Sequence, residues 1–217
     1  MKEFNLIRSL ITEPRLNISL DEMLLRLVGK HTIKRSIRFY KNVDSVIVGR
    51  FQREELEVNT DYCKEKQIPV VKRFTGGGTV FHDLGNLNVT VVLPDDELIS
   101  PYLLENMHLL SKSILIALNS FGIEGTIGPH QEILVSGKKI SGCAAAKKYG
   151  GFLYHATLLM YSNLHRLNKS ISTKEINLSG KGYVRSNRAE VMNLYSIKKI
   201  PEEDLEMAIF ESFEKML

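Results

Sequence analysis

The stretch RFTGGGTVFHDLGN, residues 73–86, combines residue types that could bind an anion. Consecutive backbone N–H groups in a glycine turn form a concavity that binds anions, and glycine lets a ligand approach the main chain closely. Arg73 at the entrance could add a bidentate pair to a phosphate or a carboxylate. The stretch has neither the Lys-Ser or Lys-Thr of a P-loop nor the spacing of a Rossmann fingerprint. On the glycines alone, a glycine-rich hairpin turn with charged residues nearby is an equally weighted alternative.

The context of the glycines favours a structured site. Residues 68–74, IPVVKRF, and residues 86–94, NLNVTVVLP, are apolar and are typical of strands. A turn between two such strands is expected to be structured rather than a linker. His82 and Asp83 follow the glycines within five residues, so polar groups converge there.

A second candidate is GKKISG, residues 137–142. A lysine between two glycine-containing turns can be held rigidly against a developing negative charge. A lysine pair in a hairpin is also typical of a solvated surface, and this alternative stays open on the residues alone. Lys138 and Lys139 alternate faces on a strand, so only one of them is expected to point inward.

The chain has two cysteines, Cys63 and Cys143. Two cysteines give neither a disulfide framework nor a metal cluster, and they suit a reducing, cytoplasmic location. Cys143 lies four residues after Lys139 and would be a nucleophile if nearby lysines lowered its pKa. Packing beneath the hairpin is the favoured interpretation for Cys143. Cys63 lies in a polar helix and receives no role.

Composition predicts one globular domain of mixed α and β structure over residues 1–217. Hydrophobic residues make up 43% and charged residues 25%, which is enough for a packed core. The net charge of +4 comes without a dense basic run, so nucleic-acid binding is not expected. The short lysine pairs at 138–139, 147–148 and 198–199 are interpreted mostly as surface. No signal peptide and no run of about eighteen apolar residues is found, so no membrane span is predicted.

Three helices are predicted from apolar spacing and capping signals. Ser19 and Glu22 form a capping box for a first helix that ends at Gly29. Ser100 caps the longest helix, and the last helix starts after Pro201. The predicted apolar faces are Leu20, Met23, Leu24 and Leu27 in the first helix, Leu104, Met107, Leu110, Ile114 and Leu118 in the second, and Leu205, Ile209 and Phe213 in the third.

The remaining elements are shorter. Residues 36–42 and 45–50 are predicted to form a hairpin, and residues 59–67 a short polar helix. Residues 132–142 are predicted to form a second hairpin that turns at Ser136-Gly137. Residues 152–162 are a further strand, and residues 164–195 a long polar loop with short helical pieces.

Together, these motifs resemble the lipoate–protein ligase family, whose fold is shared with biotin ligases. The resemblance covers nearly the whole chain and is most specific in RFTGGGTVFHDLGN, with KKISG at the expected position downstream. It implies an α+β (mixed α/β) fold with a mostly antiparallel sheet flanked by helices, related to class II synthetase catalytic domains. The other matching stretches are NISLDEMLLR, SVIVGRFQ, KKISGCAAA, YHATLL and VRSNRAEVMNL.

The resemblance implies a two-step reaction with ATP, Mg²⁺ and lipoate. The lipoate carboxylate attacks the α-phosphate to give lipoyl-adenylate, and a protein lysine then takes the acyl group. The implied acceptors are lipoyl domains of 2-oxoacid dehydrogenase E2 subunits or the glycine cleavage H protein. The chain stops where a C-terminal accessory domain often begins in this family, so a separate accessory subunit is expected, with a self-sufficient short form as the alternative. A cytoplasmic monomer is expected.

The resemblance also assigns residues to roles. Lys139 matches the essential lysine, which contacts the oxygens where charge accumulates. Glu132 is the implied metal ligand. The implied lipoate- and ATP-binding residues are Arg73, Gly76, Gly77, Gly78, Thr79, Val80, Phe81, His82, Asp83, Asn86, Ser141, Gly142, His155, Ala156 and Thr157.

The sequence departs from the family pattern at three places. Gln131-Glu132 stands where an Asn-Asp pair is usual, which puts the metal or adenine contacts there in doubt. Ala156 replaces a usual glycine and is expected to narrow the pocket. The segment VRSNRAEVMNL is about three residues longer than usual.

Two other functions remain open. Octanoyl or lipoyl transferases use this fold with a cysteine thioester, but no cysteine occupies residues 180–191 or the position just upstream of the lysine hairpin. Such a transferase would have to use Cys143. The third hypothesis is a non-catalytic homologue that binds lipoate, and the presence of Arg73, Lys139 and His155 argues against it. Biotin as substrate fits the motif less well.

Overall fold

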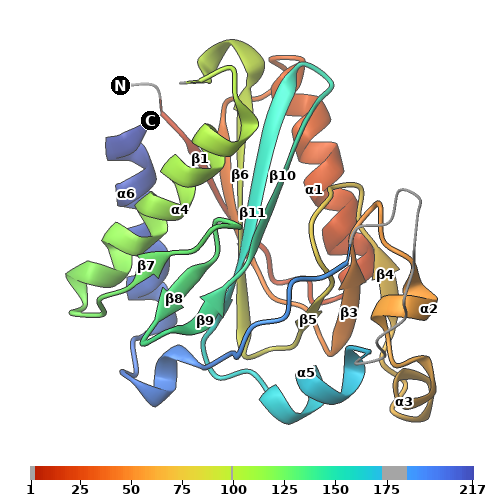
Figure 1. The fold of residues 1–217 in the computed structure, drawn as a ribbon. Helices are drawn as coiled ribbons and strands as arrows, with labels where there is room; N and C mark the ends of the chain where they lie inside the picture. The colour runs from red at the N-terminus through yellow and green to blue at the C-terminus, as the bar shows by residue number, and fades with distance from the viewer. Residues whose placement is uncertain (1–2, 99, 173–184) are drawn as a thin grey trace.

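A central sheet separates one helix from two others in the computed structural model, which describes residues 3–98, 100–172 and 185–217 (Figure 1). β1 and β2 run parallel, and the remaining neighbours in this sheet run antiparallel. The predicted α+β class, with a mostly antiparallel sheet flanked by helices, is confirmed. In pairing order the strands are β1 (Asn5–Arg8), β2 (Ser36–Tyr40), β6 (Asn86–Pro94), β11 (Gly151–Leu159) and β10 (Cys143–Lys148).

Both faces of this sheet are covered, so β6 is buried along its whole length. Val89 and Val91 pack in the core under α4 and α6, whereas Val92 packs against α1 on the other face. This division follows from the alternation of side chains along a strand. The three helices are α1 (Pro14–Gly29), α4 (Leu103–Ser120) and α6 (Glu202–Met216).

Two smaller sheets hold the two stretches with predicted chemistry in place. One contains the strands on either side of the glycine turn, and the other contains the lysine hairpin. In pairing order they are β4 (Val70–Lys72), β3 (Ser45–Val48) and β5 (Val80–His82), then β7 (Thr126–Ile127), β8 (Ile133–Val135) and β9 (Lys138–Ser141). The short helices are α2 (Glu54–Glu57), α3 (Thr60–Glu65) and α5 (Leu164–Ser170), with 3₁₀ turns at Asp95–Glu97 and Leu194–Ser196.

The glycine turn crosses the end of β3. β4 and β5 lie on opposite sides of β3 and do not pair with each other, so the turn is not a hairpin turn. The Arg50 N–H donates to the carbonyl oxygen of Thr75 at 2.8 Å, which ties the turn to the chain leaving β3. A Cβ on Gly49 would lie 2.1 Å from the carbonyl oxygen of Gly77. The crossing therefore requires glycine at position 49.

The first helix begins five residues before the predicted cap. Glu13 is the N-cap and accepts a hydrogen bond from the Leu16 N–H at 2.5 Å. Ser19 lies inside the helix, where its hydroxyl donates to the carbonyl oxygen of Arg15, so the predicted capping box is wrong. Of the four residues of the predicted apolar face, Leu24 is buried, Leu20 and Leu27 are half-buried, and Met23 is 50% exposed, so this prediction is only partly right. The buried residues of α1 are Pro14, Asn17, Ile18, Asp21, Leu24, Leu25 and Val28.

The strands predicted at 36–42 and 45–50 exist, but they do not form a hairpin. β2 pairs with β1 and β6 in the central sheet, whereas β3 pairs with β4 and β5. Asn42 lies in the link between them and is fully buried. The link between the two strands is short enough for a hairpin, but each strand pairs instead with strands that are distant in the sequence.

Most other elements agree with the sequence. The hairpin turns at Ser136 and Gly137, which have φ angles of 51° and 75°. The longest helix begins at Leu103, three residues after its predicted cap, and its predicted residue Leu104 is 64% exposed. Part of the predicted long loop, residues 173–184, lies outside the described residues. None of the helices in the described part of the chain is long and apolar enough to cross a membrane.

Gly49→Ala tests the crossing. The added methyl group would press on the turn, and overpacking of this kind lowers the free energy of unfolding by about 1–3 kcal/mol. Gly122→Ala is the control: that position is open, but its φ of 75° still disfavours alanine by about 1–2 kcal/mol. Urea unfolding measures both variants. Equal midpoints for Gly49→Ala and the unsubstituted chain would contradict the close contact.

Candidate active site

The glycine turn is folded around the buried guanidinium of Arg73. Its Nη2 donates to the carbonyl oxygens of Gly76 at 2.6 Å and Gly78 at 2.7 Å. Its Nε donates to Thr75 Oγ1 at 3.0 Å, and its Nη1 donates to the carbonyl oxygen of Ile47 at 3.2 Å. Burial lowers the pKa of Arg73 to about 10, so the side chain stays charged at neutral pH. The residue predicted to pair with a ligand thus donates to the turn itself.

Lys139 points inward from its hairpin, and Lys138 points outward. Lys138 Nζ lies 2.5 Å from Glu190 Oε1 at the surface. The Lys139 side chain lies across Gly142, where a Cβ would come within 2.9 Å of Nζ. Burial lowers the pKa of Lys139, and the nearby carboxylate of Glu132 acts against this shift. The prediction that only one lysine faces inward is confirmed.

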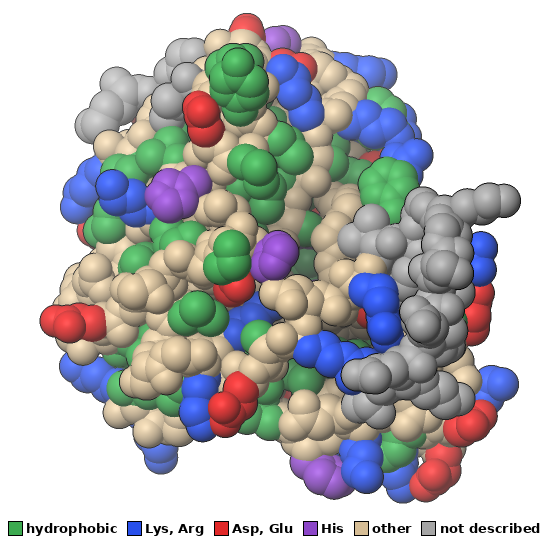
Figure 2. Space-filling view, in the orientation of Figure 1, with side chains coloured by type: hydrophobic (Ala, Val, Ile, Leu, Met, Phe, Trp, Pro, Cys, Tyr) green, Lys and Arg blue, Asp and Glu red, His purple; other side chains and the backbone are tan. Residues whose placement is uncertain are grey.

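A cavity of about 250 Å³ lies beside Lys139. Figure 2 shows this face of the molecule hollowed near its middle, with basic side chains close to the hollow. The apolar part of the cavity wall comes from Val80, Phe81, Leu159, Leu167, Ile171, Ala189 and Val191. The predicted site residues that line it are Thr79, Val80, Phe81, Lys139, Ser141, Gly142 and Thr157.

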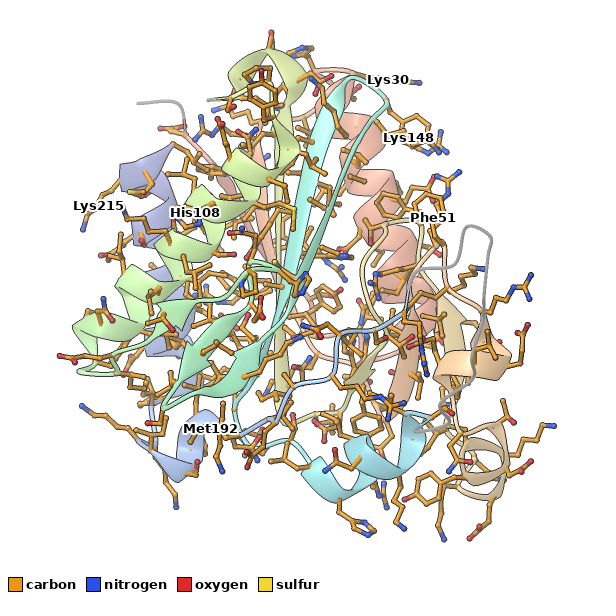
Figure 3. The ribbon with its side chains drawn as sticks, in the orientation of Figure 1. Lys30, Phe51, His108, Lys148, Met192 and Lys215 are labelled. Carbon is orange, nitrogen blue, oxygen red and sulfur yellow. The ribbon has the colours of Figure 1, made fainter. Side chains whose placement is uncertain are left out.

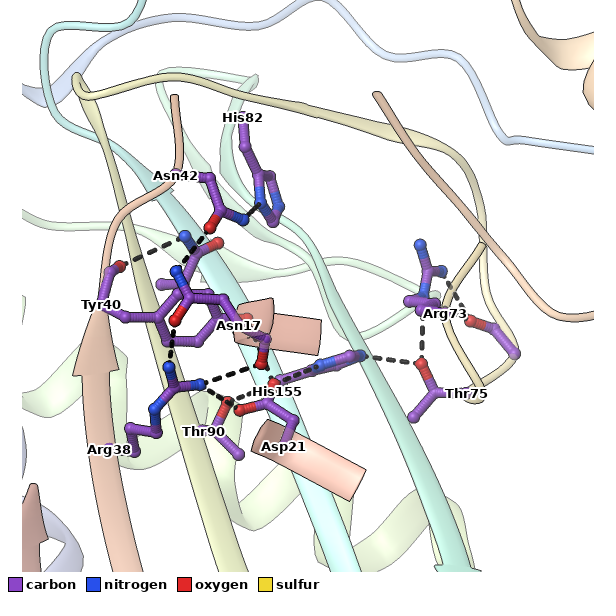
Figure 4. Close-up of polar contacts among 12 residues, drawn as sticks. Asn17, Asp21, Arg38, Tyr40, Asn42, Arg73, Thr75, His82, Thr90 and His155 are labelled. Carbon is purple, nitrogen blue, oxygen red and sulfur yellow. Dashed lines mark hydrogen bonds and ion pairs between the residues drawn. The ribbon is translucent and has the colours of Figure 1, made fainter. Parts of the chain in front are cut away.

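Asp21, which the sequence did not indicate as a site residue, lies at the centre of a buried polar network on the α1 face of the sheet (Figure 4). Its Oδ1 accepts a hydrogen bond from Arg38 Nη1 at 2.7 Å. Its Oδ2 accepts from Thr90 Oγ1 at 2.9 Å and from Tyr40 OH at 3.1 Å. Burial by itself would raise the pKa of Asp21, but hydrogen bonding with His155 and the charge of Arg38 lower it below its usual value.

His155 connects this network to the glycine turn. Its Nδ1 lies 3.5 Å from Asp21 Oδ2, and its Nε2 lies 2.9 Å from Thr75 Oγ1. Thr75 Oγ1 also accepts the hydrogen bond from Arg73 Nε. Burial lowers the pKa of His155, so the imidazole is neutral at pH 7. The structure therefore brings the predicted residues Arg73 and His155 together, through a threonine between them.

In the other direction the network reaches His82. Arg38 Nη2 donates to Asn17 Oδ1, and Asn17 Nδ2 donates to Asn42 Oδ1 at 2.7 Å. Asn42 Nδ2 lies 2.9 Å from His82 Nδ1 (Figure 4). Burial, with a contribution from the charge of Arg73, lowers the pKa of His82 to about 3, so His82 is neutral.

The sequence contained a signal for the missed residues. Asn17 and Asp21 are four residues apart, so they share one helical face. That face also carries Ile18 and Leu25, which are buried. Polar residues at helical spacing among buried apolar ones indicate a polar network. The wrong helix start and the partly wrong apolar face hid this signal.

Two predicted ligand-binding residues instead hold the chain together outside the cavity. Asp83 Oδ1 accepts from the Gly85 N–H at 2.9 Å, and its Oδ2 accepts from the Asn163 N–H at 2.6 Å. Asn86 Nδ2 donates to Asn88 Oδ1 at 2.9 Å. These bonds fix the turn between β5 and β6 and the start of α5. Neither residue lines the cavity.

Glu132 lies in the loop before the lysine hairpin. Its Oε2 accepts a hydrogen bond from the His130 N–H at 2.8 Å, and the side chain is 7% exposed. Gln131 points elsewhere, with Oε1 3.0 Å from His108 Nδ1 on α4. Among the described residues, no three His, Cys, Asp or Glu side chains are grouped as they would be to hold a metal ion. A single carboxylate such as Glu132 is enough for a Mg²⁺ ion whose other ligands are mainly phosphate oxygens of the substrate and water.

Ala156 does not face the cavity. It packs in the core under α4, while its neighbours His155 and Thr157 face the opposite side of β11. The expectation that Ala156 narrows the pocket is therefore wrong. Alternation along the strand sends its methyl group into the core.

Cys143 does not line the cavity. Its Sγ lies 3.3 Å from the carbonyl oxygen of Gln131 and 3.8 Å from Ser111 Oγ. Burial raises the pKa of its thiol to about 11, so little thiolate exists at neutral pH. The favoured interpretation, packing beneath the hairpin, is confirmed. Cys143 is partly buried against the main core, and Cys63, to which the sequence gave no role, is buried in another core cluster.

Exposed lysines lie elsewhere. Figure 3 shows Lys30, Lys148 and Lys215 pointing outward from the surface. Lys147, Lys148, Lys198 and Lys199 are all exposed, as expected for short surface pairs. The inward lysine of the hairpin is therefore in a different environment from these residues.

Comparisons with known proteins show which family the chain resembles. The family model of the lipoyl protein ligase A/B catalytic domain matches residues 13–214. Lipoate-protein ligase LplJ of Bacillus subtilis is 32% identical over 184 residues, which are 85% of this chain and 54% of that protein. This chain thus spans about half the length of the Bacillus protein.

Two further matches extend over more of both chains. Lipoate-protein ligase A subunit 1 of Thermoplasma acidophilum is 29% identical over 213 residues, which are 94% of this chain and 79% of that protein. A crystal structure of lipoate-protein ligase A bound with ATP matches with a TM-score of 0.84 and 27% identity. That match covers 99% of this chain and 85% of the other.

The environment of Cys143 predicts a slow thiol. In Cys63→Ser, iodoacetamide should modify native Cys143 at pH 7.5 about a hundredfold more slowly than an ordinary cysteine, because its thiolate fraction is that much lower. The rate should rise about tenfold per pH unit until the pH approaches 11, since only the thiolate reacts. The same variant unfolded in urea is the control. Equal native and unfolded rates at pH 7.5 would contradict the raised pKa.

Proposed function

The chain belongs to the lipoyl protein ligase A/B catalytic-domain family, and on that premise we propose that it activates lipoate with ATP and transfers the lipoyl group to a lysine of a lipoyl-domain protein. One observation carries the proposal: Lys139 lines a cavity together with Thr79, the residue that follows the glycines, while burial raises the pKa of the nearby Cys143 thiol to about 11. A lysine at the cavity and a thiol with a raised pKa suit adenylation. They do not suit thioester transfer.

Adenylation needs charge stabilisation more than a protein nucleophile. The lipoate carboxylate attacks the α-phosphorus of ATP, the bond to pyrophosphate breaks, and negative charge accumulates on the phosphoryl oxygens. A positioned cation in a partly dehydrated site stabilises this charge more strongly than water does. Lys139 has that position, because Gly142 leaves the space its side chain fills.

The cavity is the proposed nucleotide site. Its apolar wall, with Phe81, Leu159 and Val191, suits the flat adenine ring, and Thr79, Ser141 and Thr157 offer polar groups near Lys139. Mg²⁺ bound to the phosphates would neutralise charge in the reacting nucleotide. Glu132 is the proposed protein ligand of that ion.

The proposed acceptors are lipoyl domains of 2-oxoacid dehydrogenase E2 subunits or the glycine cleavage H protein. We also propose that a separate accessory subunit supports adenylation, since the matching Thermoplasma protein is named subunit 1 and this chain covers 79% of it. Residues 1–217 are proposed to form one catalytic domain that works as a cytoplasmic monomer with free Cys63 and Cys143.

Pyrophosphate release from lipoate and Mg²⁺–ATP tests the proposal, with mass spectrometry of the adenylate. Lys139→Ala should lose activity about a hundredfold to a thousandfold, because one essential donor to the developing charge is removed. Lys138→Ala should keep the wild-type rate, since that side chain points outward. Wild-type activity in Lys139→Ala would overturn the assigned role.

The same assay decides whether the chain acts alone. Lipoyl-adenylate formed by the purified chain would show that no companion is needed for activation. If none forms, preformed lipoyl-adenylate and an apo lipoyl domain should still give lipoylated product. Failure of that second step as well would contradict the ligase function.

Cys143→Ser separates a ligase from a thioester transferase. ATP-dependent lipoylation of a lipoyl domain should stay near the wild-type rate, because a partly buried thiol with a raised pKa takes no part in it. The product is measured by intact mass. A dead Cys143→Ser variant with an unchanged unfolding midpoint would favour acyl transfer through the thiol.

A further inference from the structure

A buried ion pair lies two hydrogen bonds away from the glycine turn. Arg38 and Asp21 are 3% and 1% exposed at their side chains, with 2.7 Å between Nη1 and Oδ1. From Asp21 the contacts run to His155 and then to Thr75, the residue just before the glycines. Thr75 Oγ1 finally accepts from Arg73 Nε. The pair is thus connected to the side chain that shapes the turn.

A gain in folding stability is a weak explanation for the buried Asp21–Arg38 pair. Removing two charges from water is costly, and apolar residues of similar volume are often as stabilising as a buried ion pair. Here both partners are richly hydrogen-bonded: Asp21 also accepts from Tyr40 and Thr90, and Arg38 also donates to Asn17. Hydrogen bonds on both partners fix the geometry of this pair, which an apolar core does less specifically.

The direction of each hydrogen bond is determined by its neighbours. Ionised Asp21 can only accept, so neutral His155 carries its hydrogen on Nδ1 and leaves Nε2 as an acceptor. Thr75 must then donate its hydroxyl hydrogen to Nε2. That orientation leaves the lone pairs of Oγ1 free to accept from Arg73 Nε, which can only donate. The opposite tautomer would leave Nδ1 without a hydrogen and place its lone pair against the ionised Asp21 Oδ2, where neither atom can donate.

We propose that Asp21 and Arg38 are positioning residues of the adenylation site, acting through the tautomer of His155 and the hydroxyl of Thr75 to hold the glycine turn. The proposal rests on the proposed function above. Three consecutive glycines have many backbone conformations available. Arg73 selects one by binding the carbonyl oxygens of Gly76 and Gly78, and the network fixes the orientation of Arg73.

The tautomer is measurable without any substrate. Two-bond ¹H–¹⁵N spectra distinguish the protonated from the unprotonated ring nitrogen, and the His155→Asn variant identifies the signal among the six histidines. At pH 7 the wild-type ring should be neutral with hydrogen on Nδ1. A charged ring, or hydrogen on Nε2, would overturn the proposal.

Asp21→Asn tests the consequence for catalysis. Asparagine keeps the shape but offers an N–H₂ group, so part of the His155 population should move its hydrogen to Nε2. Adenylate formation should fall about tenfold to a hundredfold in kcat/KM, as expected for a misplaced reacting geometry. Glu206→Gln is the matched control, because Glu206 is a largely buried carboxylate paired with Arg8 at 2.6 Å on the opposite face of the sheet. It should lower stability without changing adenylation.

Thr75 provides a second test if Asp21→Asn fails to fold. Thr75→Val removes the hydroxyl at nearly constant volume and should lose adenylation to a similar extent, whereas Thr75→Ser should recover most of it. Folded Asp21→Asn or Thr75→Val with the wild-type rate would overturn the proposal. If the wild-type chain forms no adenylate even with a companion subunit, the proposed function fails, while the tautomer measurement still decides the arrangement of hydrogen bonds.

Discussion

The site depends on one buried guanidinium. Three consecutive glycines between two strands have no preferred conformation unless a cation binds their carbonyl oxygens. Arg73 fixes the turn by donating to Gly76 and Gly78 while it also binds the end of β3 through Ile47. The turn must cross β3 because β4 and β5 flank that strand. Sheet topology and one side chain together determine where the backbone of the turn lies.

Burial acts in opposite directions on the two reactive groups of the hairpin region. It lowers the pKa of Lys139 and raises the pKa of Cys143, because it disfavours the charged form of each group. For the thiol, loss of the charged form removes the nucleophile. For the lysine, Glu132 opposes the shift and favours the ammonium. Burial near the hairpin therefore suits Lys139 for charge stabilisation and makes Cys143 a poor nucleophile for thioester chemistry.

The polar network relates the fold to the site. Asp21 comes from α1, Arg38 and Tyr40 from β2, Thr90 from β6 and His155 from β11. These residues meet because β2, β6 and β11 are neighbours in the sheet and α1 covers one face of it. A helix and three strands are thereby aligned with the glycine turn. The core that stabilises the domain also supplies the framework that orients its proposed active site.

The sequence by itself determined the mixed α and β class, the strands on either side of the glycine turn, the lysine hairpin and the inward position of one lysine. These features depend on local patterns: side-chain alternation along strands and the residues of the turns. Tertiary structure decided that β2 and β3 join different sheets, that Ala156 faces the core, and that Asp21 and Arg38 lie beside His155. Pairing between segments distant in the chain is set by the total burial of apolar surface and the satisfaction of buried charges, and no local spacing records either quantity.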